Sequence, residues 1–214
     1  MSKPLIIFPF GGNAREALAI ILANDGLKRE WDVLGFIDDN KSTWKKEIGG
    51  IKVFGGKDIL KKYPTVSVLA VPGNPDNYKE REKIIAGLKI KESRFATVIH
   101  PSVIVPTNAK IGYNSLVMPY VVLGSNVTIG NHCVILPNTT IGHDSTIDDY
   151  SCVGSNVSIA GSVTIKDHCY IGSGSNLRDG ITMGAKSLVG LGSNVITNVK
   201  KEVVVAGNPA KLLK

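Results

Sequence analysis

A six-residue repeat constrains the fold of this 214-residue chain more than any other feature of its sequence. From Val105 to Val195, every sixth residue is a large aliphatic side chain or a methionine. A period of six fits neither an α-helix nor a simple strand, whose apolar positions recur at 3.6 and 2 residues. It fits short strands wound into a three-sided parallel solenoid, with three hexapeptides in each coil. The repeated positions are Val105, Ile111, Val117, Leu123, Ile129, Ile135, Ile141, Ile147, Val153, Ile159, Ile165, Ile171, Leu177, Met183, Val189 and Val195.

Two other positions of the hexapeptide also carry a preference. A glycine often follows the aliphatic residue, as at Gly142 and Gly154, and a small or β-branched side chain stands four residues after it, as at Thr139 and Ser145. We expect the aliphatic residue to fill the interior and the small residue to pack under the next coil. We expect the glycine to relieve backbone strain near each corner.

The first half of the chain lacks this repeat and alternates strand-like with helix-like segments. The alternation predicts a small parallel sheet with helices on its faces, a Rossmann-like domain over residues 1–98. The solenoid domain is expected over residues 99–214, after a linker near Phe95–Pro101. Strands are predicted over Leu5–Phe8, Val33–Ile37 and Val66–Val71, and helices over Asn13–Asn24, Lys57–Lys62 and Pro75–Leu88.

Composition excludes several classes of protein. The net charge is +7, but the lysines are scattered and no nucleic-acid-binding motif is present, so nucleic acid is not an expected partner. A mild basic excess suits an anionic ligand. The apolar run Leu5–Phe10 is too short for a signal peptide, and no run reaches membrane-spanning length, so a cytoplasmic protein without membrane insertion is expected. The three cysteines lack CxxC spacing, so neither a disulfide framework nor a zinc site is expected.

Two sets of histidines fall on different corners of the predicted solenoid. His132, Tyr150 and His168 share one corner of successive coils, which are about 4.8 Å apart. The two imidazoles would then be about 10 Å apart, too far for one metal ion, so we interpret this set as a structural column and expect no metal.

His143 occupies another corner, in the sequence Gly142-His143-Asp144, and the residue one coil above it is Gly161. An exposed imidazole beside a carboxylate and facing a gap is what a general base needs. The alternative is an ordinary surface histidine on a turn.

Cysteine nucleophiles are a weaker interpretation. Cys133 and Cys169 stand at inward positions of the repeat, and Cys152 has no base adjacent in sequence.

Candidate ligand-binding residues follow the three predicted strands of the first domain. A glycine turn that leads into a helix offers free amides to a phosphate, and an acid after the second strand is placed as a ribose or base contact would be. The alternative is a tight turn and a solvated strand end. The candidates are Gly11, Gly12, Asn13, Asp38, Asp39, Gly73 and Asn74.

These features together resemble one family. The glycine turn, the paired acids, Ile99-His100-Pro101, the Gly-His-Asp hexapeptide and the tail Ala206–Lys211 are similar to those of NeuD/PglD-type sugar acetyltransferases. The resemblance implies a left-handed β-helix and a homotrimer, with a nucleotide-sugar on the N-terminal domain and acetyl-CoA between adjacent solenoids. The outward apolar residues Val122 and Val134, which need cover, also favour a trimer.

The resemblance further implies residue roles. His143 corresponds to the catalytic base and Asp144 to its partner acid, and a backbone N–H of Ala160 or Gly161 would hold the oxyanion. Two departures concern Cys152, which stands where the family often has a second histidine, and the phosphate turn, which Pro9 and Ala14 weaken. The acetyl-CoA contacts implied are Ala160, Gly161, Asn208, Pro209 and Lys211.

The expected function is therefore acetyl-CoA-dependent N-acetylation of a nucleotide-linked amino sugar, of the 4-amino-4,6-dideoxy type, in surface glycan biosynthesis. Two alternatives remain open at this point. One is O-acetylation of a sialic acid or another sugar hydroxyl. The other is a non-catalytic trimeric scaffold that binds nucleotide-sugars.

Overall fold

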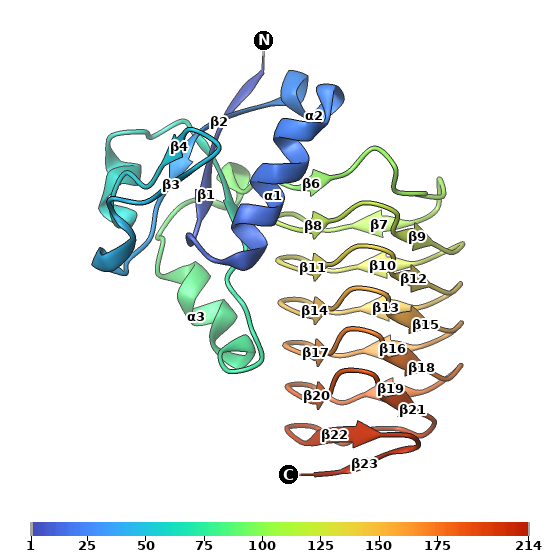
Figure 1. Ribbon diagram of the computed structural model, residues 1–214. Helices are drawn as coiled ribbons and strands as arrows, with labels where there is room; N and C mark the ends of the chain where they lie inside the picture. The colour runs from blue at the N-terminus through green and yellow to red at the C-terminus, as the bar shows by residue number, and fades with distance from the viewer. Residues whose placement is uncertain (1, 214) are drawn as a thin grey trace.

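The computed structural model describes residues 2–213 and shows two parts side by side, an α/β part and a prism-shaped solenoid (Figure 1). The N-terminal sheet has three parallel strands in the order β2-β1-β5. These are β1 (Lys3–Phe8), β2 (Trp31–Phe36) and β5 (Ser67–Ala70). Leu5, Ile6 and Ile7 are fully buried, which is the pattern of a parallel strand covered on both faces.

Helices cover both faces of this sheet. Helix α1 (Gly12–Ala23) packs through Leu18 on the face that carries Leu5, whereas α3 (Arg81–Ala86) packs through Ile85 on the face that carries Ile6. The remaining elements of this part are α2 (Asp25–Glu30), η1 (Lys41–Thr43), β3 (Glu47–Ile48), β4 (Ile51–Lys52), η2 (Lys57–Lys61), η3 (Tyr78–Glu80) and η4 (Glu92–Arg94).

The predicted strands and the first two helices are confirmed within a few residues, but the helix predicted over Pro75–Leu88 is wrong in extent. The chain forms a turn first, because the Asn74 side-chain oxygen accepts hydrogen bonds from the backbone N–H groups of Asp76 and Asn77. Only η3 and α3 then follow. Asparagine competes in this way with helix formation by offering backbone groups a local partner.

The solenoid consists of two-residue strands that form three parallel sheets. The strands pair in register with those eighteen residues further on, as Ile129 does with Ile147, except in the last coil, where Leu188 pairs with Val204, sixteen residues further on. One sheet contains β6 (Val98–Ile99), β8 (Leu116–Val117), β11 (Val134–Ile135), β14 (Cys152–Val153), β17 (Tyr170–Ile171), β20 (Leu188–Val189), β22 (Val204–Gly207) and the antiparallel β23 (Ala210–Leu212). The second contains β7 (Lys110–Ile111), β10 (Thr128–Ile129), β13 (Thr146–Ile147), β16 (Thr164–Ile165) and β19 (Thr182–Met183). The third contains β9 (Val122–Leu123), β12 (Thr140–Ile141), β15 (Ser158–Ile159), β18 (Asn176–Leu177) and β21 (Asn194–Val195).

The repeated aliphatic side chains fill the solenoid interior, as predicted, except that Val105 is 42% exposed. The small residues are buried as well. Their hydroxyls donate across the coil, as Thr139 does to the carbonyl oxygen of Gly154 at 2.8 Å. This explains why serine and threonine are tolerated in an otherwise apolar core.

The expected role of the repeat glycines is wrong. The left-handed backbone conformation falls two residues after the glycine, at residues such as Asn126 and Asp144, and not at Gly142. A Cβ atom on Gly142 would lie 2.5 Å from the carbonyl carbon of Ala160 in the next coil. Glycine is required here because the backbone of the next coil approaches closely, not because of strain.

The sheet that contains β8 and β11 also carries the N-terminal part. Leu116, Met118 and Val134 are buried in one cluster with Leu5 and Leu18. The expectation that Val134 needs cover from another chain is therefore wrong, because its own N-terminal domain covers it. Val122 remains exposed.

Candidate active site

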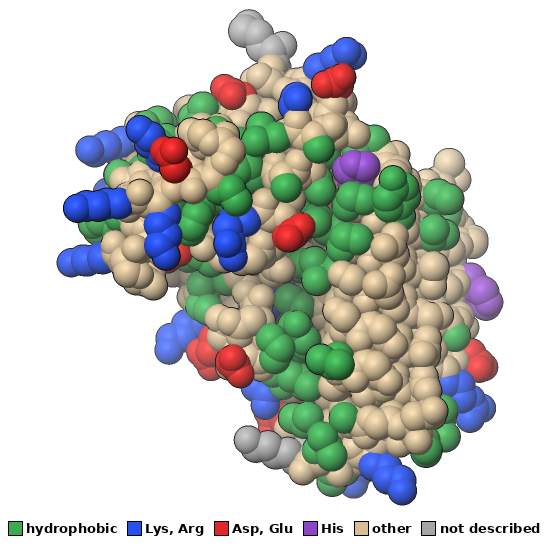
Figure 2. All heavy atoms as spheres, in the orientation of Figure 1, with side chains coloured by type: hydrophobic (Ala, Val, Ile, Leu, Met, Phe, Trp, Pro, Cys, Tyr) green, Lys and Arg blue, Asp and Glu red, His purple; other side chains and the backbone are tan. Residues whose placement is uncertain are grey.

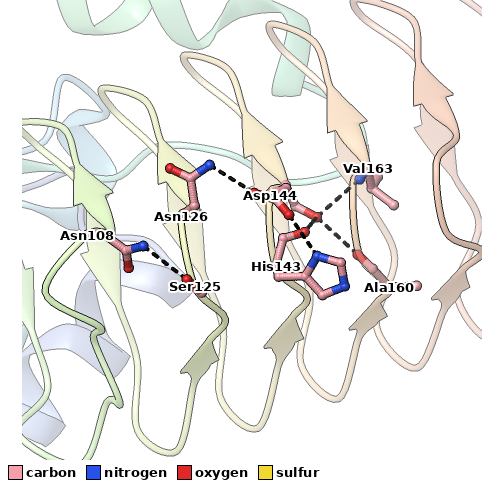
Figure 3. A network of polar contacts seen from close by, with 8 residues as sticks. Asn108, Ser125, Asn126, His143, Asp144, Ala160 and Val163 are labelled. Atoms are coloured by element: carbon pink, nitrogen blue, oxygen red, sulfur yellow. Dashed lines mark hydrogen bonds and ion pairs between the residues drawn. The ribbon is translucent and has the colours of Figure 1, made fainter.

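His143 lies on the corner that joins β12 to β13, where the chain turns from one sheet of the solenoid to the next (Figure 3). We call this the His143 corner; it contains Ser125 and Asn126, His143 and Asp144, and Gly161 and Ser162 on successive coils. Backbone hydrogen bonds between coils fix the turn. Asp144 donates to the Ser125 carbonyl oxygen at 2.9 Å, and Ser162 donates to that of His143 at 2.7 Å.

Asp144 orients the imidazole. The Nδ1 atom of His143 lies 2.8 Å from Oδ2 of Asp144, and the amide of Asn126 donates to Oδ1 at 2.9 Å. The hydrogen bonds from Asn126 and His143 hold the pKa of Asp144 below its usual range. With an ionised carboxylate at Nδ1, the neutral imidazole carries its proton there and leaves the Nε2 lone pair free.

Gly161 leaves the space beside Nε2 open. A Cβ atom on this glycine would lie 2.6 Å from Nε2 of His143, so any side chain here would displace the ring. The His143 side chain is 68% exposed. The sequence prediction of an exposed imidazole beside an acid and facing a gap is confirmed in these respects.

Only one of the two predicted oxyanion donors is available. The N–H of Ala160 donates to the Leu177 carbonyl oxygen at 3.1 Å, so of the two predicted alternatives, Ala160 or Gly161, only Gly161 is left as a donor. Within residues 2–213 the N–H of Gly161 has no such acceptor. The two residues differ because Ala160 still takes part in the backbone hydrogen bonds between coils, whereas Gly161 lies in the turn that follows.

The second set of histidines forms a structural column, as predicted. The Tyr150 ring is stacked between His132 and His168, with centroids 4.6 and 5.0 Å away. Burial, and then the charge of Arg81, lower the pKa of His132 to about 4, so this imidazole is neutral.

Neither inward cysteine has the character of a nucleophile. Cys133 is fully buried, and burial raises the pKa of its thiol to about 12. Burial also raises the pKa of Cys169. Among residues 2–213, no group of three His, Cys, Asp or Glu side chains is arranged to hold a metal ion.

A cleft of about 540 Å³ opens at the carboxyl ends of β1, β2 and β5. Phe8, Asp38 and Pro72 mark the three strand ends. This is where open parallel sheets bind their ligands. Lys57 and Lys83 line the cleft as well and were missed from the sequence, because lysines are scattered throughout this half of the chain. Figure 2 shows many of the Lys and Arg side chains gathered over the N-terminal part.

The paired acids lie at this cleft but are already engaged. Both carboxylate oxygens of Asp38 accept backbone hydrogen bonds, one from Phe10 and one from Asn40. Asp39 accepts from the N–H of Lys57 and forms an ion pair with its Nζ at 3.1 Å. Asp38 therefore shapes the cleft, and Asp39 is the more accessible of the two acids.

The other predicted ligand contacts do not line the cleft together. Gly11 and Gly12 lie where α1 begins, and the Asn13 amide donates to the carbonyl oxygens of Val71 and Gly73 instead of pointing into the cleft. Asn13 and Gly73 line a separate small hollow against the solenoid, next to Cys152 and Tyr170. The Asn74 side chain caps its own turn.

The C-terminal tail forms a hairpin. Strands β22 and β23 pair antiparallel, and Asn208 and Pro209 form the connection through a cis peptide bond. Lys211 lies on β23. The tail thus closes the last coil, several coils beyond His143 on the solenoid axis (Figure 1). No helix among the described residues is long and apolar enough to cross a membrane.

Solved structures share this fold over the whole chain. A histidine-to-asparagine mutant of perosamine N-acetyltransferase from Caulobacter crescentus, in complex with CoA and GDP-perosamine, matches with a TM-score of 0.85 at 22% identity, covering 100% of this chain and 98% of that one. The acetyltransferase domain of PglB from Neisseria gonorrhoeae, in complex with acetyl coenzyme A, matches at 0.85 and 23%, covering 100% of both. WeeI from Acinetobacter baumannii matches at 0.83 and 24%, also covering 100% of both.

Sequence comparison gives a narrower result. No curated protein matches the chain in sequence. The family model described as the GMPPB C-terminal domain matches residues 96–207, which is the solenoid together with the residues that lead into it. The chain therefore belongs to the GMPPB C-terminal domain family.

Proposed function

We propose that this protein is an acetyl-CoA-dependent N-acetyltransferase that acts on a nucleotide-linked amino sugar of the 4-amino-4,6-dideoxy type, in surface glycan biosynthesis. The observation that carries the proposal is the His143–Asp144 pair, whose free Nε2 faces the gap over Gly161. The fold shared along the full chain with acetyltransferases solved with CoA and GDP-perosamine, or with acetyl-CoA, supports it.

The geometry suits direct acyl transfer without a covalent enzyme intermediate. Nε2 of His143 takes the proton of the amine as its nitrogen forms a bond to the thioester carbonyl carbon. Asp144, at 2.8 Å, stabilises the imidazolium. The N–H of Gly161 donates to the oxyanion that develops. The C–S bond then breaks, and the imidazolium returns its proton to the departing thiolate.

The N-terminal part, Rossmann-like in its three parallel strands and flanking helices, holds the nucleotide. The amides of Gly12 and Asn13, where α1 begins, favour a phosphate, whereas the N–H of Gly11 already donates to the Pro9 carbonyl oxygen at 2.8 Å. Lys83 adds positive charge at the cleft, where Lys57 is paired with Asp39. Asp39 is placed for the ribose or the base. Ala160, Gly161 and the hairpin residues Asn208, Pro209 and Lys211 would contact acetyl-CoA.

The acceptor and the base come from different chains in this proposal. The N-terminal part packs on the sheet of β8, β11 and β14, whereas the His143 corner joins the other two sheets. An acceptor held in the cleft is thus brought to His143 of a neighbouring copy. We propose a homotrimer of left-handed solenoids in the cytoplasm, with the site between adjacent copies.

The release of free CoA thiol tests the proposed function. Acetyl-CoA is incubated with the protein and with UDP-, GDP- and dTDP-linked 4-amino sugars, each paired with its 4-hydroxy counterpart as the control. We expect thiol release with at least one amino sugar, and a product heavier by one acetyl group. Release with hydroxyl sugars alone would favour O-acetylation, and no release with any acceptor would favour the scaffold.

A further inference from the structure

A fully buried arginine joins the two parts of the molecule. Arg81, on α3, is 0% exposed, and its acceptors are main-chain carbonyl oxygens rather than carboxylates. It donates to Pro72, which follows β5, and to His132 and Tyr150 on the solenoid. Burial of a guanidinium group costs free energy unless its N–H groups are hydrogen-bonded. The presence of arginine here is therefore explained by its hydrogen bonds and not by the space that it fills.

The segment held by Arg81 is the loop that follows β5 at the edge of the cleft. From the other side, the Asn13 amide binds the carbonyl oxygens of Val71 and Gly73. Together, Asn13 and Arg81 fix the carbonyl groups of Val71, Pro72 and Gly73.

Gly73 is wedged into this arrangement. Its φ is +142°, a conformation that favours glycine, and a Cβ atom there would lie 2.6 Å from Nη1 of Arg81 and 3.1 Å from Sγ of Cys152. The loop therefore lies directly against the solenoid.

Asn114, on the solenoid, makes a second polar contact between the two parts. The Asn114 side chain accepts from the backbone N–H of Ala70 and donates to its carbonyl oxygen, both at 2.8 Å, as a neighbouring strand would. Its amide nitrogen also lies 2.7 Å from Nδ1 of His132. The end of β5 and the loop after it are thus attached to the same corner of the solenoid by two independent side chains.

We propose that Arg81 is a positioning residue that fixes the nucleotide-binding part, and with it the acceptor amine, at the distance from the solenoid that transfer requires. This inference rests on the proposed function. Arg81 does not touch the reacting atoms. It acts through the loop Val71–Gly73, so its loss should affect the acceptor and not acetyl-CoA.

Arg94 offers a matched control. Arg94 is only partly buried, but it too donates to main-chain carbonyl oxygens, those of Val66 and Tyr63, and both lie within the N-terminal part. Arg81→Lys and Arg94→Lys are compared by steady-state kinetics and by amide hydrogen exchange over residues 70–74. We expect Arg81→Lys to raise the KM for the amino sugar nucleotide roughly tenfold. We expect it also to speed exchange in that loop and to leave the KM for acetyl-CoA within about twofold. Arg94→Lys should change neither KM.

The outcomes separate the two proposals. If Arg81→Lys folds and keeps both KM values, the positioning role is wrong, whether or not exchange is faster. If the wild-type protein releases no thiol with any amino sugar, the proposed function fails first. Where Arg81→Lys does not fold, Asn114→Asp serves instead. It keeps a side chain that tolerates the left-handed backbone at this position (φ 54°) but removes the donor to Ala70 and His132, and the same KM pattern is expected.

Discussion

The Nδ1 atom of His143 lies 2.8 Å from Oδ2 of Asp144, the next residue in the chain, and the left-handed backbone of Asp144 makes this contact possible. Adjacent side chains on a regular strand point to opposite faces and cannot meet in this way. The turn at this corner of the solenoid thus brings the side chains of two neighbouring residues together, so that the acid orients the base.

Replacement of His143 by asparagine should lower kcat by about 10²–10⁴-fold with little change in either KM, because a general base contributes that much to the rate. Steady-state kinetics at pH 7 measures the effect. His168→Asn, in the stacked column, is the control and should cost much less. A normal kcat for His143→Asn together with inactive His132→Asn or His168→Asn would move the catalytic corner to the column.

Gly161→Ala should act by displacement of the imidazole, since the new Cβ would lie 2.6 Å from Nε2. We expect a lower kcat and a higher KM for acetyl-CoA, with the KM for the sugar nucleotide unchanged. Ser125→Ala, on the same corner two coils before Gly161, is the control. Equal effects from the two changes would contradict the role of the gap.

Lys83→Ala should raise the KM for the sugar nucleotide about three- to tenfold, because it removes one cation from the cleft. Binding of acetyl-CoA, measured by calorimetry, should not change. Lys28→Ala, on an exposed surface of α2 where Lys28 pairs with Asp25, controls for net charge. A raised Kd for acetyl-CoA in Lys83→Ala would overturn the division of ligands between the two parts.

Stability should fall as the pH is lowered from about 6.5 to 4. The pKa of His132 is lowered from 6.5 to about 4, first by burial and then by Arg81. In that window the unfolded chain binds a proton that the folded protein does not, so the contribution is fully present above pH 6.5 and is lost as the pH falls toward 4. Urea unfolding at pH 7 and 4.5 should reveal roughly 1–3 kcal/mol from this group. A His132→Gln variant should show a flatter pH dependence, and a slope equal to that of the wild-type protein would contradict this role of His132.

Light scattering should give about three times the chain mass of 22.8 kDa at micromolar concentration. Val122, exposed in one copy, is a position that assembly would cover. A monomer of 22.8 kDa would remove the trimer and with it the proposed site between copies.

Much of the solenoid could be predicted because the same pattern of core residues recurs in every coil. Each coil repeats the one before, so the position of Ile147 above Ile129 follows from the period alone, and so do the stacked rings of His132, Tyr150 and His168. His143 and Gly161 could be placed one coil apart for the same reason.

The contacts between the two parts could not be predicted in this way. Arg81 and Asn114 have partners 51 and 44 residues away, in segments whose relative placement no repeat specifies. Asp38 appeared free for a ligand because the sequence does not reveal that Phe10 and Asn40 turn their N–H groups toward it. The engagement of the Ala160 N–H with the next coil likewise depends on which residue of the turn leaves the ladder.

The Asn114 amide that pairs with both main-chain groups of Ala70 also has a consequence for solubility. An uncovered outer strand of a parallel sheet can recruit a strand from another molecule and so start aggregation. Along the outer edge of β5, Val68 forms a parallel bridge with Phe95 and accepts a hydrogen bond from the N–H of Ala96. The N–H and the carbonyl group of Ala70 are both bound by the Asn114 side chain. The solenoid therefore shields its own N-terminal domain from edge-to-edge association between molecules. Asn114→Ala should aggregate at concentrations where the wild-type protein stays in solution.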